Sequence, residues 1–262
     1  MIGLFLGEKE LPLKILSTLK RKKLNFFIID LTKTNKFKLE KNSHFINIGK
    51  FGKILELIHS KNCKKVIFAG NIIKPKISKL KLDLKGLYYI PRILKASKIG
   101  DAAILKELIK ILAENKIKVI SLNSYNPEMT LKKGCYTKIK PTKDDLIIIK
   151  NGIKHLKSIN GYNHVQGLII NDKKIVKLES KKGTKEMIKS LRISTDKNIL
   201  VKIPKSKQDL RADLPTVGLD TLKDCKRAKI KGIALKGGQN IFLNKDKSIK
   251  FANLNKMFVV AI

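Results

Sequence analysis

The first half of the chain alternates short apolar runs with stretches in which apolar residues recur every three or four positions. The apolar runs predict buried strands at residues 2–6, 25–30, 66–68 and 119–121. The helical spacing predicts helices at residues 11–23, 51–60 and 101–115. A strand–helix–strand succession favours an open, mostly parallel sheet.

The periodic pattern stops between about residues 122 and 141. Turn signals replace it at Asn126-Pro127, Lys132-Lys133-Gly134 and Lys140-Pro141. We therefore predict an α/β protein with a Rossmann-like, mostly parallel N-terminal domain at 1–125, a linker at 126–141, and a C-terminal α/β domain with a mixed sheet at 142–262.

The C-terminal domain begins with a capping-box pattern, Thr142-Lys143-Asp144-Asp145, ahead of a predicted helix that runs to about Asn160. A hairpin-like pair follows at 165–171 and 175–179, joined across Asp172-Lys173. Further elements are predicted as a helix at 184–191, strands at 199–203, 232–235 and 257–261, and helices near residue 220 and before the last strand.

The chain carries 58 Lys and Arg against 21 Asp and Glu, a net charge of +37, yet only five of the cations are arginine. An excess of Lys, Ile and Asn is typical of an AT-rich genome, whereas a nucleic-acid footprint favours arginine for bidentate phosphate contacts. The charge nevertheless attracts the molecule to anionic surfaces and substrates, an attraction that salt screens.

The sequence contains no membrane-span, signal-peptide or zinc-binding pattern, and this bears on the compartment and on the metal content that we expect. No apolar stretch reaches the ~18 residues of a membrane span, and the first residues lack the basic start and long apolar core of a signal peptide, so we expect a cytoplasmic protein. The three cysteines, Cys63, Cys135 and Cys225, are widely spaced and form no Cys-x-x-Cys pair, which argues against structural zinc and disulfides.

Carboxylates are rare in this lysine-rich chain, and two of them stand together with three cations in the loop at 204–218. The loop joins Asp209 and Asp213 to Lys205, Lys207 and Arg211. Aspartate that holds a divalent cation, beside cations that neutralise phosphate oxygens, suits phosphoryl or pyrophosphoryl chemistry. A solvated loop between a strand and a helix is the alternative.

The same residues resemble a known family, the UDP-2,3-diacylglucosamine pyrophosphatases of lipid A synthesis of the alphaproteobacterial type. The likeness is most specific over residues 209–218, Asp-Leu-Arg-Ala-Asp-Leu-Pro-Thr-Val-Gly. It is supported in order along the chain by 68–75, Gly100-Asp101, Glu128-Met129-Thr130 and Gly183-Thr184.

The resemblance implies a Mg²⁺-dependent hydrolase that cleaves UDP-2,3-diacylglucosamine to UMP and 2,3-diacylglucosamine 1-phosphate, lipid X. It also implies a homodimer, a substrate enclosed by the two domains, and catalysis in the C-terminal domain. The family's essential aspartate falls on Asp213, which would either bind Mg²⁺ or orient the attacking water.

Arg211 is expected to assist Asp213 and, with Lys205 and Lys207, to face the phosphates. Asn71 either reads a uridine or sugar edge or only forms a turn, and Asp101 either binds metal or caps its helix. The remaining residues expected to bind substrate are Gly7, Gly70, Thr130, Gln166, Thr184 and Thr216.

The chain departs from the family pattern at three places. Glu8 and Lys9 follow Gly7 where small residues are usual, so that a glutamate adds bulk and negative charge beside an anion. Ala102 and Lys185 stand where the family tends to have acidic residues. If those carboxylates help to hold metal, the affinity is expected to be lower here.

A diacylated substrate calls for an apolar tunnel or a surface that meets the bilayer. Residues 80–94 mix basic and apolar side chains as interfacial segments do, although a packed domain edge would look the same. Two other functions remain open: a basic, non-catalytic nucleic-acid-binding protein, which the scarcity of arginine and exposed aromatics disfavours, and an inactive relative that only binds a nucleotide sugar.

Overall fold

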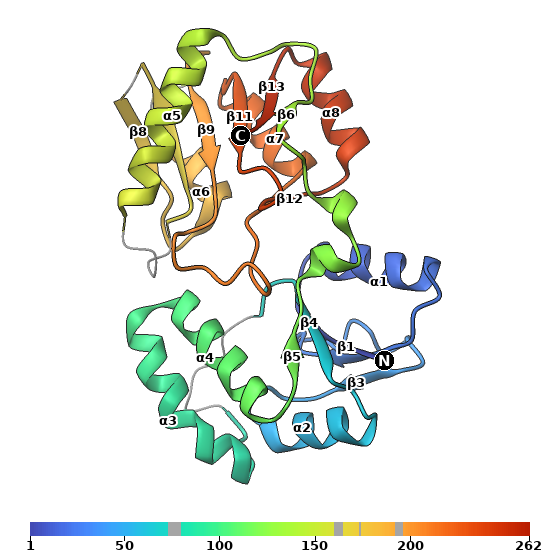
Figure 1. The fold of residues 1–262 in the computed structure, drawn as a ribbon. Helices are drawn as coiled ribbons and strands as arrows, with labels where there is room; N and C mark the ends of the chain where they lie inside the picture. The colour runs from blue at the N-terminus through green and yellow to red at the C-terminus, as the bar shows by residue number, and fades with distance from the viewer. Residues whose placement is uncertain (73–79, 160–164, 173, 192–195) are drawn as a thin grey trace. The chain divides into compact units, whose positions relative to one another are not determined.

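The computed structural model describes residues 1–72, 80–159, 165–172, 174–191 and 196–262, and it divides into two units (Figure 1). The first unit comprises Met1–Pro127 together with Arg211–Asp213, and the second comprises Glu128–Leu210 and Leu214–Ile262. Residues 73–75 of the family likeness, Asn160 at the end of a predicted helix and Lys173 of the predicted hairpin turn lie outside the described residues.

The first unit is built on a five-stranded sheet with the order β3-β2-β1-β4-β5, in which every paired neighbour is parallel. Its strands are β1 (Ile2–Leu6), β2 (Phe26–Asp30), β3 (Ser43–Phe45), β4 (Lys65–Ala69) and β5 (Lys118–Val119). Its helices are α1 (Leu11–Arg21), α2 (Phe51–Ser60), α3 (Leu84–Ile99) and α4 (Asp101–Glu114), followed by a 3₁₀ turn at Leu122–Ser124. The predicted Rossmann-like parallel sheet is confirmed.

Both faces of this sheet are covered, which is why its strands read as continuous apolar runs. Phe5, Phe27 and Ile29 form one core with side chains from α2, α3 and α4. The alternate positions Leu4 and Ile28 are also fully buried, and α1 lies on the side of the sheet opposite α2 (Figure 1).

Two elements of this unit were not predicted. Helix α3 contains Pro91 and places apolar residues on all sides, so its helical period is blurred. Strand β3 is short and polar, and it forms because its backbone pairs with β2.

The second unit contains a six-stranded sheet with the order β6-β13-β11-β9-β7-β8. The sheet has both parallel and antiparallel neighbours, so the predicted mixed sheet is confirmed. Its strands are β6 (Gly134–Cys135), β7 (Gly167–Asn171), β8 (Lys174–Leu178), β9 (Ile199–Lys202), β11 (Gly232–Leu235) and β13 (Phe258–Ala261), and β10 (Thr216–Val217) pairs separately with β12 (Ile241–Phe242). Its helices are α5 (Lys143–Ser158), α6 (Gly183–Lys189), α7 (Leu219–Arg227) and α8 (Lys245–Leu254), besides a 3₁₀ turn at Pro127–Met129 at the division between the units.

Alternate residues of the central strands enter two cores in this sheet as well. Leu168 and Val201 pack with α5, whereas Ile169 and Leu200 pack with α6, α7 and α8. The predicted hairpin is confirmed as the antiparallel pair of β7 and β8.

The segment 126–141, expected as a linker, contains β6, which pairs antiparallel with β13. Among the described residues, no helix is both long and apolar enough to cross a membrane.

Candidate active site

The first unit places β1 between β2 and β4, so the chain crosses from one side of β1 to the other. Ligands of open α/β sheets bind beyond the carboxyl ends of the strands at such a switch point. Gly7 follows β1 and Gly70 follows β4, and both were predicted from the sequence as binding residues. The two glycines therefore mark the edge where this sheet is expected to receive a ligand.

The backbones beyond these strand ends are closely joined. The N–H of Gly7 donates to Ala69 O at 2.8 Å, and Glu8 and Asn71 exchange two backbone hydrogen bonds of 2.8 and 3.2 Å. A Cβ atom at Gly7 would lie 2.6 Å from Asn71 O. Gly70 has a φ of +84°, and a Cβ atom there would lie 2.5 Å from the Pro12 ring. Both positions therefore require glycine.

Glu8 does not present a free negative charge beside this edge. Its carboxylate pairs with the Lys36 ammonium and accepts the backbone N–H of Lys33 at 3.0 Å. The Lys36 hydrogen bond, followed by that from Lys33, holds the pKa of Glu8 below its ordinary value. The glutamate that departs from the family pattern is thus paired with the Lys36 ammonium and hydrogen-bonded by the backbone of Lys33.

Asp213 belongs to the first unit, although the residues before and after the tripeptide Arg211–Asp213 belong to the second. Ala212, between the two predicted catalytic residues, packs against the core of the first unit that contains Phe5 and Phe27. Asp213 itself is half-buried. Its carboxylate therefore lies in the same unit as the glycine edge and as Asp101.

Asp213 supplies a carboxylate oxygen, the type of ligand that Mg²⁺ prefers. Among the described residues, no three His, Cys, Asp or Glu side chains gather as a metal site would require. Mg²⁺ keeps several waters and is usually held by one or two carboxylates together with substrate phosphates. The Asp213 carboxylate is thus a donor of the chemical type that Mg²⁺ takes.

The loop before this tripeptide is shaped by Gln208, which is buried. Its Oε1 atom accepts the N–H of Lys205 at 2.9 Å, and its own N–H donates to Lys205 O at 3.1 Å. Lys207 is exposed between them. After the tripeptide, Thr216 begins β10 and its hydroxyl donates to Leu214 O at 3.2 Å.

A second group of predicted residues meets around Glu179, directly after β8. Its carboxylate accepts the N–H of Gln166 at 3.1 Å and the hydroxyl of Thr184 at 2.5 Å. Lys202 Nζ, at the end of β9, lies 3.0 Å from Glu179 Oε1 and 2.7 Å from Thr184 Oγ1. The Lys202 and Glu179 side chains are each only 3% exposed, so this is a buried ion pair.

The sequence reasoning missed Glu179 and Lys202. A signal was present, because Glu179 is one of the rare carboxylates and stands at a strand end. The Oε1 atom of Gln166 beside this cluster is buried and has no hydrogen-bond partner among the described residues. A buried acceptor without a donor is a place where a ligand hydroxyl or amide can bind.

Asp101 and Thr130 belong to other parts of the chain. Asp101 is the first residue of α4, and the N-cap is Gly100, so the reading of Asp101 as the N-cap is wrong. Thr130 forms a backbone bridge with Ile241. Lys185, on α6, is exposed.

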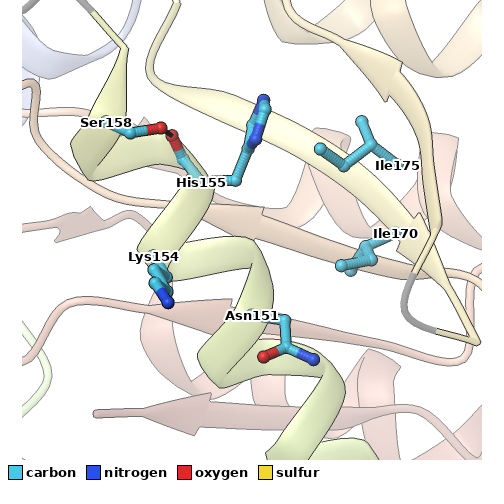
Figure 2. A pocket seen from close by; sticks show the side chains of 6 residues that line it. All are labelled: Asn151, Lys154, His155, Ser158, Ile170 and Ile175. Atoms are coloured by element: carbon cyan, nitrogen blue, oxygen red, sulfur yellow. Dashed lines mark hydrogen bonds between the residues drawn. The ribbon is translucent and has the colours of Figure 1, made fainter.

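The second unit also has a cavity of about 320 Å³ between α5 and the β7–β8 hairpin. Figure 2 shows the helix contributing Asn151, Lys154, His155 and Ser158, and the strands contributing Ile170 and Ile175. The Ser158 hydroxyl donates to His155 O at 2.8 Å, within the helix. None of the predicted site residues lines this cavity.

Comparison with known proteins accounts for nearly the whole chain. The model described as the LpxI N-terminal domain matches residues 1–129, and that described as the LpxI C-terminal domain matches residues 132–260. A protein from Caulobacter vibrioides named UDP-2,3-diacylglucosamine pyrophosphatase LpxI is 26% identical over 271 residues, which cover 100% of this chain and 97% of the relative. The chain therefore belongs to the LpxI family.

Proposed function

We propose that this protein hydrolyses the pyrophosphate bond of UDP-2,3-diacylglucosamine in lipid A synthesis, releasing UMP and 2,3-diacylglucosamine 1-phosphate. The observation that carries the proposal is the match of both LpxI domain models along the chain, together with the unbroken run from Asp209 to Gly218. The glycine edge at the switch point and the assignment of Asp213 to the same unit support it.

In this proposal Asp213 holds Mg²⁺ or orients the attacking water, and Arg211 neutralises charge on the phosphates. Hydrolysis of a pyrophosphate depends mainly on positioning and on stabilisation of developing negative charge. Mg²⁺ would be held by Asp213 and would supply part of that stabilisation. Lys205 and Lys207 act on the same anionic groups from the preceding loop.

The substrate-binding residues fall into groups of different chemistry. Gly7, Gly70 and Asn71 offer backbone and a side-chain amide at the edge of the parallel sheet. Gln166 offers the buried acceptor oxygen described above, suited to a hydroxyl or imide donor of the nucleotide. Asp101, Thr130, Thr184 and Thr216 remain proposed contacts. Of these, Thr184 is already engaged by Glu179 and Lys202.

The decisive experiment measures UMP release with Mg²⁺ for the unaltered protein and for Asp213→Asn. The substitution keeps the size of the side chain but removes the charge, and we expect the rate to fall at least ~100-fold while substrate binding persists. Asp220→Asn is the matched control, because Asp220 is an exposed aspartate in the first turn of α7.

An unaltered rate in Asp213→Asn would overturn the assigned role of Asp213. Absence of UMP release from the unaltered protein, with intact binding of the substrate, would instead favour the inactive nucleotide-sugar binder. We expect chelation of divalent ions to stop the reaction, and added Mg²⁺ to restore it.

We further propose that the enzyme is a homodimer that works at the cytoplasmic face of the inner membrane, where its diacylated substrate resides. Sedimentation equilibrium tests the first part: a single species at the mass of one 29.6 kDa chain would exclude the dimer.

A further inference from the structure

The start of helix α3 exposes large apolar side chains. Leu84 is 85% exposed, Leu87 55% and Tyr88 71%. These three residues lie within the first five positions of the helix, and Pro91 is exposed one turn later. At 100° per residue, positions 84, 87, 88 and 91 share one side of a helix, so the exposed residues form a continuous stripe.

Away from the stripe, α3 is fixed to its neighbours. Tyr89 is buried, and its ring lies 5.6 Å from that of Phe51 in α2. Arg92 is 2.7 Å from Glu107 and from Glu114 on α4, and these carboxylates raise the pKa of the guanidinium, Glu114 contributing most. The contacts hold the helix so that its apolar stripe stays exposed.

The charge around the stripe is positive. Lys81, Lys85, Lys95 and Lys98 are exposed along the same segment. Asp83 is the one carboxylate between residues 80 and 100, and it accepts backbone N–H groups of Gly86, Gly52 and Lys53 at 2.8, 3.0 and 3.1 Å. The Asp83 carboxylate is therefore occupied by the backbone at the starts of α2 and α3. The four lysines are exposed to solvent, and residues 80–100 supply no other carboxylate to offset their charge.

We propose that the stripe of Leu84, Leu87, Tyr88 and Pro91 is the surface by which this protein docks on an anionic lipid bilayer. Leucine and tyrosine insert at the headgroup boundary while lysines bind anionic headgroups, which is the pattern of interfacial helices. A protein partner fits less well, because a stable interface buries about 800 Å² on each side and is depleted in lysine at its core. The inference deepens the proposed function, since a diacylated substrate is supplied from a membrane, but binding to vesicles can be measured without any substrate.

The chain has no tryptophan, so one introduced tryptophan reports on one site alone. Leu87→Trp places the probe in the stripe, and Leu254→Trp, at a residue 74% exposed at the end of α8, is the matched control. With vesicles of phosphatidylglycerol and phosphatidylcholine, we expect the emission of Leu87→Trp to shift to the blue and to be quenched by brominated acyl chains. The control should show neither effect.

Leu84→Ser/Leu87→Ser should sediment with these vesicles at least ~10-fold more weakly than the unaltered protein, because two leucines lose their burial in the bilayer. Leu39→Ser/Leu254→Ser, which removes two exposed leucines elsewhere, should bind like the unaltered protein. Equal quenching at positions 87 and 254, or none at either, would overturn the proposal. So would a blue shift of Leu87→Trp that needs no vesicles and grows with protein concentration, because a second copy of the chain would then cover the stripe.

Discussion

Gly70 is the residue whose replacement tests the glycine edge most directly. Its φ of +84° disfavours any side chain, and an added Cβ would collide with the Pro12 ring and with Glu8 O at 2.6 Å. Gly238 has a similar φ of +69° with no atom within 4 Å of the same added Cβ. An alanine at either position strains the backbone, but only at Gly70 does the added Cβ also collide with neighbouring atoms.

We expect Gly70→Ala to lose at least ~1 kcal/mol more unfolding free energy than Gly238→Ala, because only the former must move its neighbours. Urea unfolding followed by circular dichroism measures the difference. We also expect UMP release to fall only in Gly70→Ala. Equal losses of stability in the two variants would contradict this account, because they would show that the surroundings of Gly70 accommodate a methyl group without cost.

Single residues also show how far the sequence could be interpreted. Gly7, Gly70 and Asn71 could be placed just beyond strand ends from the sequence, because each follows an apolar run and a strand end is a local signal. The pairing of Glu8 with Lys36, or of Glu179 with Lys202, depends on which strands and loops become neighbours in the fold. In a chain with 58 Lys and Arg, the sequence offers each carboxylate many partners, and only the structure selects one.

Among the elements, the end of β9 is held by the buried Lys202–Glu179 pair. Replacing Lys202 by methionine would leave the Glu179 carboxylate buried without its cation, a change that costs about 3 kcal/mol or more. We expect Lys202→Met to lose that amount in urea unfolding, and Lys202→Met/Glu179→Leu to lose less. Lys197→Met, which breaks an exposed pair of 3.6 Å with Asp172, should change stability by less than about 1 kcal/mol. A double variant less stable than Lys202→Met would contradict this account.

Helix α5 provides the clearest dependence of stability on pH. Asp145 completes the capping box with Thr142 and pairs with Lys231 Nζ at 2.8 Å. Burial alone would raise its pKa, but the hydrogen bonds from Lys231 and Thr142 hold the pKa below the ordinary 3.8. A depressed carboxyl pKa stabilises the fold above the unfolded value, and this stabilisation is lost as the pH falls through the lower folded value.

We therefore expect the unfolding free energy to decrease as the pH falls below about 4, with a shallower decrease in Asp145→Asn, as measured by urea unfolding between pH 6 and 2.5. Asp144→Asn, at the exposed neighbour in the same turn, is the control and should keep the slope of the unaltered protein. A slope that Asp145→Asn leaves unchanged would assign the acid sensitivity to other carboxyl groups.

The elements that the sequence predicted well share a physical cause. Strands β1, β2 and β4 are covered on both faces, and the helix starting after Thr142 carries its own capping signal. Helix α3 was missed because it exposes Leu84 and Leu87 while burying Tyr89, which removes the usual contrast between apolar and polar sides. The residues that obscured the helix are the ones now proposed to meet the bilayer.

For the whole molecule, the net charge of +37 should govern encounter with an anionic substrate. We expect kcat/KM for UMP release to fall several-fold between about 50 and 500 mM salt, because screening weakens long-range attraction, whereas kcat changes little. Steady-state kinetics with the Mg²⁺ concentration held constant measure both. A kcat that falls in parallel with kcat/KM would contradict this expectation, because salt would then slow a step after the substrate has bound.

The tripeptide Arg211–Asp213 has a consequence for how the gene can be divided. A break near residue 130 follows the two family models, yet it separates the first 129 residues from an aspartate that folds with them. The amino-terminal fragment would retain the sheet and its glycines and lack the carboxylate, and the other fragment would carry the carboxylate without the sheet. Inheritance of the two halves as separate genes would therefore give two incomplete proteins.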